Sequence, residues 1–251
     1  MSKADFYDDD PKYDYTKYWL GREYENAAEE SALSSLLKGK HFKSAVDIGG
    51  GYGRLCPFLQ HFAENVTLVE PSKKQRQLGK EFLRDKDVAI VSGTSEKTTL
   101  ESNSVDLITM IRVMHHLPNP SKTFKELHRV LSDDGLLVLE VANSKNFKSR
   151  IKRLGKGSRT PLEPVDIKTN STTDVDLESP FVNHNPTRIR EQLRSAGFEQ
   201  LSTRSVSNFR SPTLKKILPR SVLIGLERAT QATLAPIEFG PSLFILLRKS
   251  R

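Results

Sequence analysis

Short apolar runs alternate with amphipathic segments between residues 44 and 142. The predicted strands are the apolar runs at 45–48, 66–69, 88–91, 105–111 and 136–141. The predicted helices are the segments at 54–63, 73–85 and 121–131, in which apolar residues recur three and four positions apart. Strands that are apolar at nearly every position are typical of a parallel sheet covered by helices on both faces. The pattern therefore predicts an α/β fold.

The flanking regions follow other patterns. A helix is predicted over 18–37, and the first 24 residues hold five of the six tyrosines and the only tryptophan. Periodicity is lost over 143–183, and because a loop of this length is uncommon inside a compact domain, we expect a lid or an insertion there. The remaining predicted elements are a helix at 186–196, strands at 198–206 and 242–247, and a helical stretch at 214–229 that Pro219 interrupts.

The composition narrows the class of protein. Among the 251 residues Cys56 is the single cysteine, which excludes a disulfide scaffold and a metal site built on paired cysteines. No apolar run approaches the roughly 20 residues that span a bilayer. No apolar segment follows Met1 in the manner of a signal peptide. We therefore expect a soluble protein located in the cytoplasm.

The net charge of +8 is distributed unevenly along the chain. Residues 145–251 contain 20 Lys and Arg against 9 Asp and Glu, a net charge of +11, whereas residues 1–144 contain 19 against 22, a net charge of −3. A basic half is compatible with nucleic acid, anionic lipid or an acidic substrate, and equally with a solvated basic surface. The charge alone leaves these alternatives open.

A glycine-rich turn follows the first predicted strand. Gly49, Gly51 and Gly53 lie in this turn, and a predicted helix begins immediately afterwards. Glycine permits positive φ angles and close approach of a ligand to the backbone, and the N–H groups of the helix can bind a polar ligand. A dinucleotide fingerprint requires glycine at its first, third and sixth positions, but the sixth position here is Arg54. The spacing therefore disfavours a nicotinamide or flavin cofactor.

An acidic residue stands at the end of the second predicted strand. Glu70 lies 21 residues beyond Gly49. A carboxylate at this place in an α/β sheet can accept two hydrogen bonds from a ribose diol. Together with the glycine turn, Glu70 predicts a site for a ligand that carries a ribose.

Five motifs occur in the order and spacing of a known family. They are VDIGGGYG at 46–53, VEPS at 69–72, GTSE at 93–96, SVDLI at 104–108 and VMHHL at 113–117. With these motifs the chain resembles the class I S-adenosylmethionine-dependent methyltransferases, and most of all the small-molecule group that includes the ubiquinone and menaquinone biosynthesis methyltransferases. The resemblance implies S-adenosyl-L-methionine as cofactor, with S-adenosyl-L-homocysteine as product. It also implies a Rossmann-like, mostly parallel seven-stranded sheet with helices on both faces.

The resemblance divides the chain into four segments. Residues 1–43 would form an N-terminal aromatic and helical lid, and residues 44–142 the cofactor-binding core. Residues 143–185 would be an insertion or mobile lid before the sixth strand. Residues 186–251 would complete the sheet.

Roles around the glycine turn also follow from the resemblance. Gly49, Gly51 and Gly53 would let the backbone pass beneath the methionine portion and the ribose of the cofactor. Asp47 would orient the turn and lie near the methionine ammonium. Gly50 stands at a cofactor-binding position that is commonly cysteine or alanine in relatives.

Further cofactor-binding roles fall on residues that follow the next strands. Glu70 would hold the ribose hydroxyls, and Pro71 would contact the adenine. Thr94, or the backbone of Ser95, would bind the adenine amino group, where many relatives have an aspartate. Arg112, after the fourth strand, would face the methionine end.

In the N-terminal segment, Arg22 lies in a stretch that resembles the helix closing over the cofactor in this group. Its guanidinium would pair with the cofactor's carboxylate in a charge-assisted contact. The alternative is a surface arginine that pairs with a nearby acid. The two alternatives differ in the effect of Arg22→Ala on cofactor affinity, which only the first would lower strongly.

Three histidines are candidates for a general base. His115 and His116 follow the fourth predicted strand, at the edge where ligands bind in open α/β sheets, and His184 would approach from the far side of the cleft. Each can accept a proton from the acceptor as the methyl group is transferred. The alternative for His115 and His116 is a structural role in capping the next helix or shaping the pocket wall.

These features predict transfer of a methyl group to an oxygen, nitrogen or carbon atom of a small-molecule acceptor by in-line displacement, without a metal. A nucleic-acid methyltransferase that uses the basic C-terminal part is a second hypothesis, although the run after the fourth strand lacks the Asn/Asp-Pro-Pro-aromatic signature of amino-base methylation. A non-catalytic protein that binds the cofactor is a third. Peripheral contact of residues 214–224 with an anionic membrane is an alternative to their packing in the core.

Overall fold

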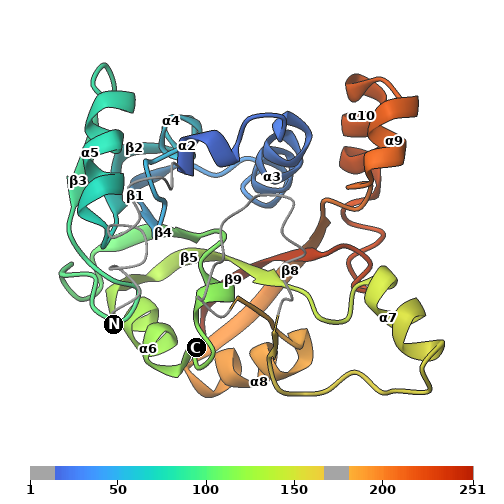
Figure 1. The fold of residues 1–251 in the computed structure, drawn as a ribbon. Helices are drawn as coiled ribbons and strands as arrows, with labels where there is room; N and C mark the ends of the chain where they lie inside the picture. The colour runs from blue at the N-terminus through green and yellow to red at the C-terminus, as the bar shows by residue number, and fades with distance from the viewer. Residues whose placement is uncertain (1–14, 167–180, 251) are drawn as a thin grey trace.

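Seven strands form the central sheet, in the order β3-β2-β1-β4-β5-β9-β8 (Figure 1). The strands are β1 (Phe42–Ile48), β2 (Ala63–Val69), β3 (Val88–Val91), β4 (Val105–Met110), β5 (Leu131–Ala142), β8 (Phe198–Val206) and β9 (Ser242–Lys249). β9 runs antiparallel to both of its neighbours, and the other strand pairs of this sheet are parallel. The computed structural model describes residues 15–166 and 181–250. The sheet confirms the predicted mostly parallel, seven-stranded α/β fold.

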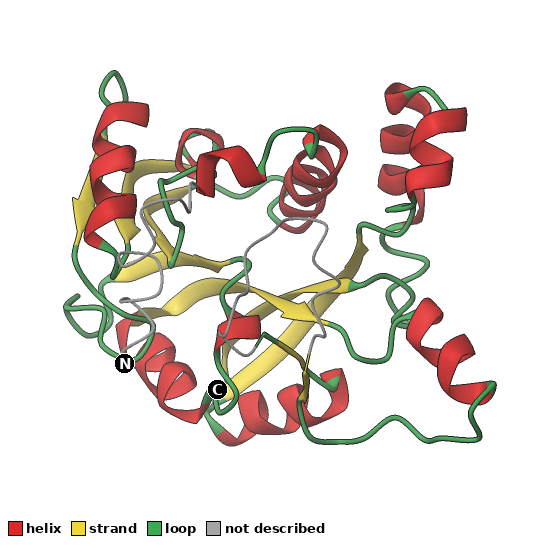
Figure 2. Cartoon of the chain, viewed as in Figure 1, coloured by secondary structure: helices red, strands yellow, loops and turns green. Residues whose placement is uncertain are grey.

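Helices cover both faces of this sheet (Figure 2). The helices are α2 (Tyr15–Tyr18), α3 (Glu23–Leu36), α4 (Cys56–Leu59), α5 (Lys73–Phe82), the 3-10 turn η1 (Met114–His116), α6 (Ser121–Val130), α7 (Phe147–Leu154), α8 (Pro186–Ser195), α9 (Pro212–Ile217) and α10 (Arg220–Thr230). Buried residues of α3 and α4 belong to one core cluster, and those of α6 and α8 belong to a second cluster. The helix predicted over 54–63 is shorter than expected, because only α4 is helical there.

The two core clusters explain why the strands are so apolar. Along β5, Leu136 and Val138 belong to one cluster, whereas Leu137 and Leu139 belong to the other. Successive side chains of a strand point to opposite faces, so a strand covered on both sides is apolar at consecutive positions. Cys56 is buried in the first cluster, where it acts as a small apolar side chain.

The predicted N-terminal helix is interrupted. Gly21 adopts a φ of +73°, in the left-handed region that favours glycine, and separates α2 from α3. The prediction of one helix over 18–37 is therefore wrong at its start. The Tyr24 hydroxyl of α3 donates a hydrogen bond of 2.6 Å to the Glu227 carboxylate of α10. This bond joins the N-terminal helix to the C-terminal part of the chain.

The region predicted as an insertion contains regular structure. α7 follows β5, and β6 (Val165–Asp166) pairs with β7 (Val182–Asn183) in a small antiparallel sheet. The sequence pattern predicted no helix at α7. Residues 167–180 of this region, like residues 1–14 of the predicted lid, lie outside the described part of the chain. Beyond it, α9 and α10 lie on either side of Pro219, as the sequence predicts.

Candidate functional site

A cavity of about 550 Å³ opens at the edge of the sheet where β1, β2, β3 and β4 end. Its walls come from the glycine turn after β1, from Glu70 and Pro71, from residues 94–96, from residues between 112 and 119, and from Tyr15 of α2. Ligands bind at this edge in open α/β sheets, and the volume is within the range of pockets for small molecules. The cavity is therefore the candidate ligand site.

The glycine turn lies so close to its neighbours that side chains would not fit. A Cβ atom at Gly49 would lie 2.6 Å from the Val113 side chain, and a Cβ atom at Gly50 would overlap the Asp47 carboxylate. Gly49 and Gly51 also have positive φ angles, +68° and +61°. The turn thus presents bare backbone to the cavity.

Glu70 lies in the cavity wall with its carboxylate held by the backbone. The N–H groups of Gly51 and Ser72 donate hydrogen bonds to its two oxygens, each at 2.9 Å. Burial, opposed by these hydrogen bonds, raises the pKa of Glu70 to about 7. Each carboxylate oxygen has a further lone pair, so Glu70 can also accept hydrogen bonds from a diol.

Asp47 and Gly53 lie behind the cavity wall. The buried Asp47 carboxylate accepts a hydrogen bond from the Thr109 hydroxyl at 2.8 Å, and burial raises its pKa to about 6. A Cβ atom at Gly53 would lie 2.6 Å from the Leu83 side chain. Both residues shape the turn, and neither is among the residues that line the cavity.

A buried amide lines the cavity without a partner. Gln75, in the first turn of α5, is 2% exposed. Neither its Oε1 nor its Nε2 atom has a hydrogen-bond partner among the residues that the structure describes. An unsatisfied buried amide destabilises a fold, so a polar ligand in the cavity would relieve this cost. Gln75 could not be selected from the sequence, because no motif marks it within a charged helix.

Arg112 follows β4 in a strained conformation. Its φ is +60°, which costs a residue with a Cβ atom about 1–2 kcal/mol. The backbone N–H of Arg112 donates a hydrogen bond of 3.1 Å to Glu140, and its Nε atom donates one of 2.6 Å to Glu29. These two acids stabilise the turn that places Arg112 in the cavity wall.

Glu29 of α3 joins two arginines beside the cavity. Its Oε2 atom accepts a hydrogen bond from Arg54 at 2.5 Å, and its Oε1 atom accepts one from Arg112 at 2.6 Å. The Trp19 ring lies 3.6 Å from the Arg54 guanidinium and 5.0 Å from that of Arg112. Arg112 is the arginine of this cluster that lines the cavity, so its guanidinium can meet a ligand carboxylate there. This Glu29 cluster could not be predicted from the sequence, since its members are far apart along the chain.

Arg22 lies outside the cavity wall. Its guanidinium stacks over the Tyr18 ring at 3.9 Å. Glu25, which is one helical turn away, binds Lys215 of α9 at 2.6 Å instead. The structure therefore does not bring Arg22 together with the other predicted cofactor residues, and the arginine that lines the cavity is Arg112.

Pro71, Thr94 and Ser95 all line the cavity, as does Glu96, which the sequence analysis did not select. The Thr94 hydroxyl accepts a hydrogen bond from the Lys97 N–H at 3.1 Å. Glu96 supplies a carboxylate to this wall, close to the position where many relatives have an aspartate.

The three candidate histidines occupy different places. His116 lines the cavity, and the His115 ring packs against it at a tilt of 42°, with ring centroids 4.1 Å apart. Both rings also lie against Phe181. His184 is buried, and its Nε2 atom lies 2.8 Å from the carbonyl oxygen of Met114. It lines a neighbouring pocket of about 280 Å³ and not the cavity.

Most of the predicted cofactor residues meet at the cavity. Those in its wall are Gly49, Gly51, Glu70, Pro71, Thr94, Ser95 and Arg112. Within residues 15–166 and 181–250, no cluster of three His, Cys, Asp or Glu side chains is suited to hold a metal ion. No helix in the same ranges has the length and apolar character needed to cross a membrane.

Comparisons with known proteins bear on the part of the chain that forms this cavity. Residues 46–139 match the family described as a methyltransferase domain. An uncharacterised methyltransferase of Bacillus subtilis is 27% identical over 118 residues, 45% of this chain and 47% of that protein. A ubiquinone biosynthesis O-methyltransferase of Coxiella burnetii is 28% identical over 115 residues, again 45% of this chain and 47% of that protein. The chain thus spans about half the length of these curated relatives.

The fold is shared over a longer stretch. The solved structure of a methyltransferase from Thermotoga maritima, dependent on S-adenosylmethionine, covers 94% of each chain with a TM-score of 0.62 and 20% identity. At this identity the likeness shows the fold alone. The domain match, the relatives and the sheet agree: over residues 46–139 this chain is a methyltransferase domain, and its fold is that of the class I S-adenosylmethionine-dependent methyltransferases, whose cofactor is S-adenosylmethionine.

Proposed function

We propose that this chain transfers a methyl group from S-adenosylmethionine to an oxygen, nitrogen or carbon atom of a small-molecule acceptor by in-line displacement. The observation that supports the proposal most strongly is the cavity, in which a bare glycine turn, the Glu70 carboxylate and the unpartnered Gln75 amide meet. These groups fit the cofactor's ribose and polar atoms. S-adenosylmethionine supplies a methyl group on a sulfonium, which is already activated for displacement.

Polar side chains of this chain would hold the cofactor at two places, the ribose and the methionine carboxylate. Glu70 would accept hydrogen bonds from the ribose hydroxyls, and the Gln75 amide would bond to the same ligand. Arg112, which Glu29 holds together with Arg54, would bind the methionine carboxylate. This assignment gives Arg112 the role that the sequence suggested for Arg22.

The adenine would lie against the residues that follow β2 and β3. Pro71 offers an apolar surface for the ring, and the Glu96 carboxylate or the Thr94 hydroxyl can accept a hydrogen bond from the amino group. Ser95 lies between Thr94 and Glu96 and also lines the cavity. The carboxylate of Glu96 would replace the aspartate of many relatives.

Aromatic side chains cover the glycine turn, which favours a small acceptor. The Tyr15 ring would lie 3.1 Å from a Cβ atom on Gly51, and it stacks on Tyr18 with centroids 5.6 Å apart. Trp19 covers the Arg54 guanidinium. Methyl transfer from a sulfonium is accelerated chiefly by orientation and by exclusion of water. A covered cavity provides both for a small molecule, whereas nucleic acid requires an open basic groove.

We assign His116 as the general base for an acceptor that must lose a proton, because it lines the cavity. His115 and His184 would be positioning residues, His115 through its contact with the His116 ring and His184 through the Met114 carbonyl. His116→Gln should lower kcat for such an acceptor by about a hundredfold and leave the affinity for S-adenosylmethionine unchanged. An unchanged kcat in His116→Gln would exclude the assignment.

Calorimetric binding of S-adenosylmethionine, followed by transfer to a panel of phenols, amines and RNA, tests the proposed function. Gln75→Leu should weaken cofactor binding by about tenfold, because it removes a polar contact, and should raise the unfolding free energy by about 1 kcal/mol, because it removes an unsatisfied buried amide. Gln77→Leu, on the exposed side of the same helix, is the matched control. Unchanged affinity in Gln75→Leu would remove Gln75 from the site.

The same assays separate the two other hypotheses. RNA or DNA binding with a steep dependence on salt, together with methylation of the nucleic acid, would support a nucleic-acid methyltransferase. Binding of S-adenosylmethionine without transfer to any acceptor would indicate a protein that keeps the fold and cofactor without turnover.

A further inference from the structure

Helix α7 carries an exposed apolar face. Phe147, Ile151 and Leu154 are 50%, 55% and 79% exposed, and their spacing of four and three residues puts them on one side of the helix. No side chain of α7 is buried in the described part of the chain. In Figure 2 the helix stands at the margin of the molecule, away from the layers that cover the sheet. A surface helix of a globular domain normally turns such a face toward the core.

The segment that contains α7 is strongly basic. Residues 141–162 contain no Asp or Glu and seven cations, which are Lys145, Lys148, Arg150, Lys152, Arg153, Lys156 and Arg159. Lys148 and Arg150 flank the apolar face when the helix is viewed along its axis. A helix that combines exposed large apolar residues with surrounding cations is suited to the interface of an anionic bilayer.

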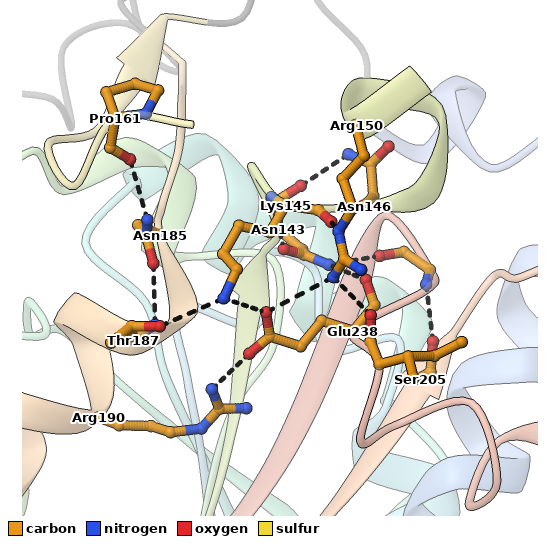
Figure 3. A network of polar contacts seen from close by, with 12 residues as sticks. Asn143, Lys145, Asn146, Arg150, Pro161, Asn185, Thr187, Arg190, Ser205 and Glu238 are labelled. Atoms are coloured by element: carbon orange, nitrogen blue, oxygen red, sulfur yellow. Dashed lines mark hydrogen bonds and ion pairs between the residues drawn. The ribbon is translucent and has the colours of Figure 1, made fainter. Parts of the chain in front are cut away.

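A polar network fixes the base of α7 (Figure 3). The buried Glu238 carboxylate binds Lys145 at 2.8 Å and Arg190 at 2.5 Å. Arg150, in the first turn of α7, donates a hydrogen bond of 2.5 Å to the carbonyl oxygen of Lys145 and lies 3.9 Å from Glu238. This Glu238 cluster attaches the first turn of α7 to α8 and to the segment before β9. The later turns, which carry the two most exposed apolar residues, project from this base.

Residues 214–224, for which the sequence suggested a membrane contact, are partly buried and partly exposed in the structure. Leu223 is buried, whereas Ile217 and Val222 are exposed on α9 and α10. Part of that stretch therefore packs in the protein, which leaves α7 as the helix with the more continuous exposed apolar face.

We propose that α7 docks this protein on an anionic lipid bilayer, with its apolar face in the interface and its cations against the lipid headgroups. The Phe147 ring stacks on Phe239. Nucleic acid would bind the cations but would leave Ile151 and Leu154 in water, so the apolar face favours lipid. Docking needs only the surface of α7 and the base that holds it. It is therefore independent of the proposed methyl transfer.

Sedimentation of the full chain with vesicles tests this docking. The vesicles contain phosphatidylcholine alone, or phosphatidylcholine with about a third of phosphatidylglycerol. We expect binding to the anionic vesicles alone, weakened at least about tenfold in the double variant Ile151→Gln/Leu154→Gln and about fivefold in Lys152→Gln or Lys156→Gln. Leu201→Gln removes an exposed apolar side chain from β8 and is the matched control.

Circular dichroism and thermal unfolding check that the variants remain folded, which we expect because both apolar residues are exposed. Absence of binding to the anionic vesicles would overturn the proposal. So would equal binding of Leu201→Gln and the double variant. Retention of the chain on RNA at the same salt concentration, unaffected by Ile151→Gln/Leu154→Gln and without vesicle binding, would assign the basic segment to nucleic acid instead.

Discussion

Two buried glutamates in this molecule each bind several cations, but in different surroundings. Glu29, beside the cavity, binds Arg54 and Arg112, whose side chains are 13% and 17% exposed. Glu238, at the base of α7, binds a lysine and an arginine whose side chains are 29% and 28% exposed. The cations of the Glu29 cluster are shielded from water, and those of the Glu238 cluster keep contact with it.

Ion pairs of the same kind, between a buried glutamate and nearby cations, thus serve two purposes in this molecule. Charges in a shielded place interact strongly, and a cation that loses its partner there cannot recover its hydration. A cation near the surface can recover it, so its ion pair contributes little. The Glu29 cluster therefore couples α3 to the glycine turn and to Arg112. The Glu238 cluster orients a surface helix.

Replacement of Glu29 should produce the largest effect. Glu29→Gln keeps the shape of the side chain but leaves Arg54 and Arg112 without a charged partner. We expect a loss of about 3 kcal/mol of unfolding free energy, measured by urea denaturation. Glu23→Gln, whose exposed carboxylate lies 3.8 Å from Arg220, is the control on the same helix. Equal losses in the two variants would contradict a shielded role for Glu29.

The second prediction concerns Glu70 in the cavity wall and the pH dependence of cofactor binding. Burial raises the pKa of Glu70 to about 7, and the proposed ribose contact needs the ionised carboxylate. The protonated fraction grows as the pH falls through this value, so the affinity for S-adenosylmethionine should be about tenfold lower at pH 6 than at pH 8. Calorimetric titrations at both pH values measure the difference. In Glu70→Gln the affinity should depend less on pH, because only the titration of Asp47, whose pKa is about 6, remains.

The contribution of Glu70 to the stability of the fold changes with pH in the opposite direction to its contribution to cofactor binding. Because the pKa of Glu70 is raised in the folded state, that state keeps a proton that the unfolded chain loses. The contribution of Glu70 to the unfolding free energy is therefore most favourable below its ordinary pKa and falls as the pH rises toward about 7. An affinity that does not change with pH in the unmodified chain would contradict the ribose contact.

Replacement of Glu238 should have a smaller effect than replacement of Glu29. Glu238→Gln leaves Lys145 and Arg190 without a carboxylate, but both side chains reach water. We expect a loss of about 1 kcal/mol in urea denaturation and faster amide exchange in the first turn of α7. Glu199→Gln, which removes an exposed pair with Arg248, is the control. A loss as large as that of Glu29→Gln would show that exposure of the cations does not separate the two clusters.

The parts of the fold that could be predicted are marked by patterns among residues that are neighbours in the sequence. The strands predicted at 88–91 and 198–206 have the bounds found in the structure, because each is a short run that begins and ends on an apolar residue. The cavity residues Gly49 and Glu70 could be selected because each stands directly after a strand. Such signals depend on a few adjacent positions.

The parts that could not be predicted depend on distant contacts. Glu29 and Arg112 are 83 residues apart, and nothing near either residue marks it as a partner of the other. Gln75 becomes important only because α5 turns it toward the cavity. α7 escaped prediction because its apolar residues, three of eight, face outward within a basic segment. Amphipathic periodicity is easiest to see where an apolar face is wide enough to be buried.

Arg22 provides the smallest expected effect and the sharpest difference between the sequence and the structure. Its guanidinium stacks on Tyr18 at 3.9 Å and lies outside the cavity wall, so Arg22→Ala should change the affinity for S-adenosylmethionine by less than about twofold. Arg112→Lys keeps the charge but loses the planar fork, and should weaken binding by at least about tenfold. Calorimetry on both variants decides between the two arginines. If Arg22→Ala were the weaker binder, the cofactor's carboxylate would be bound by Arg22 and not by Arg112.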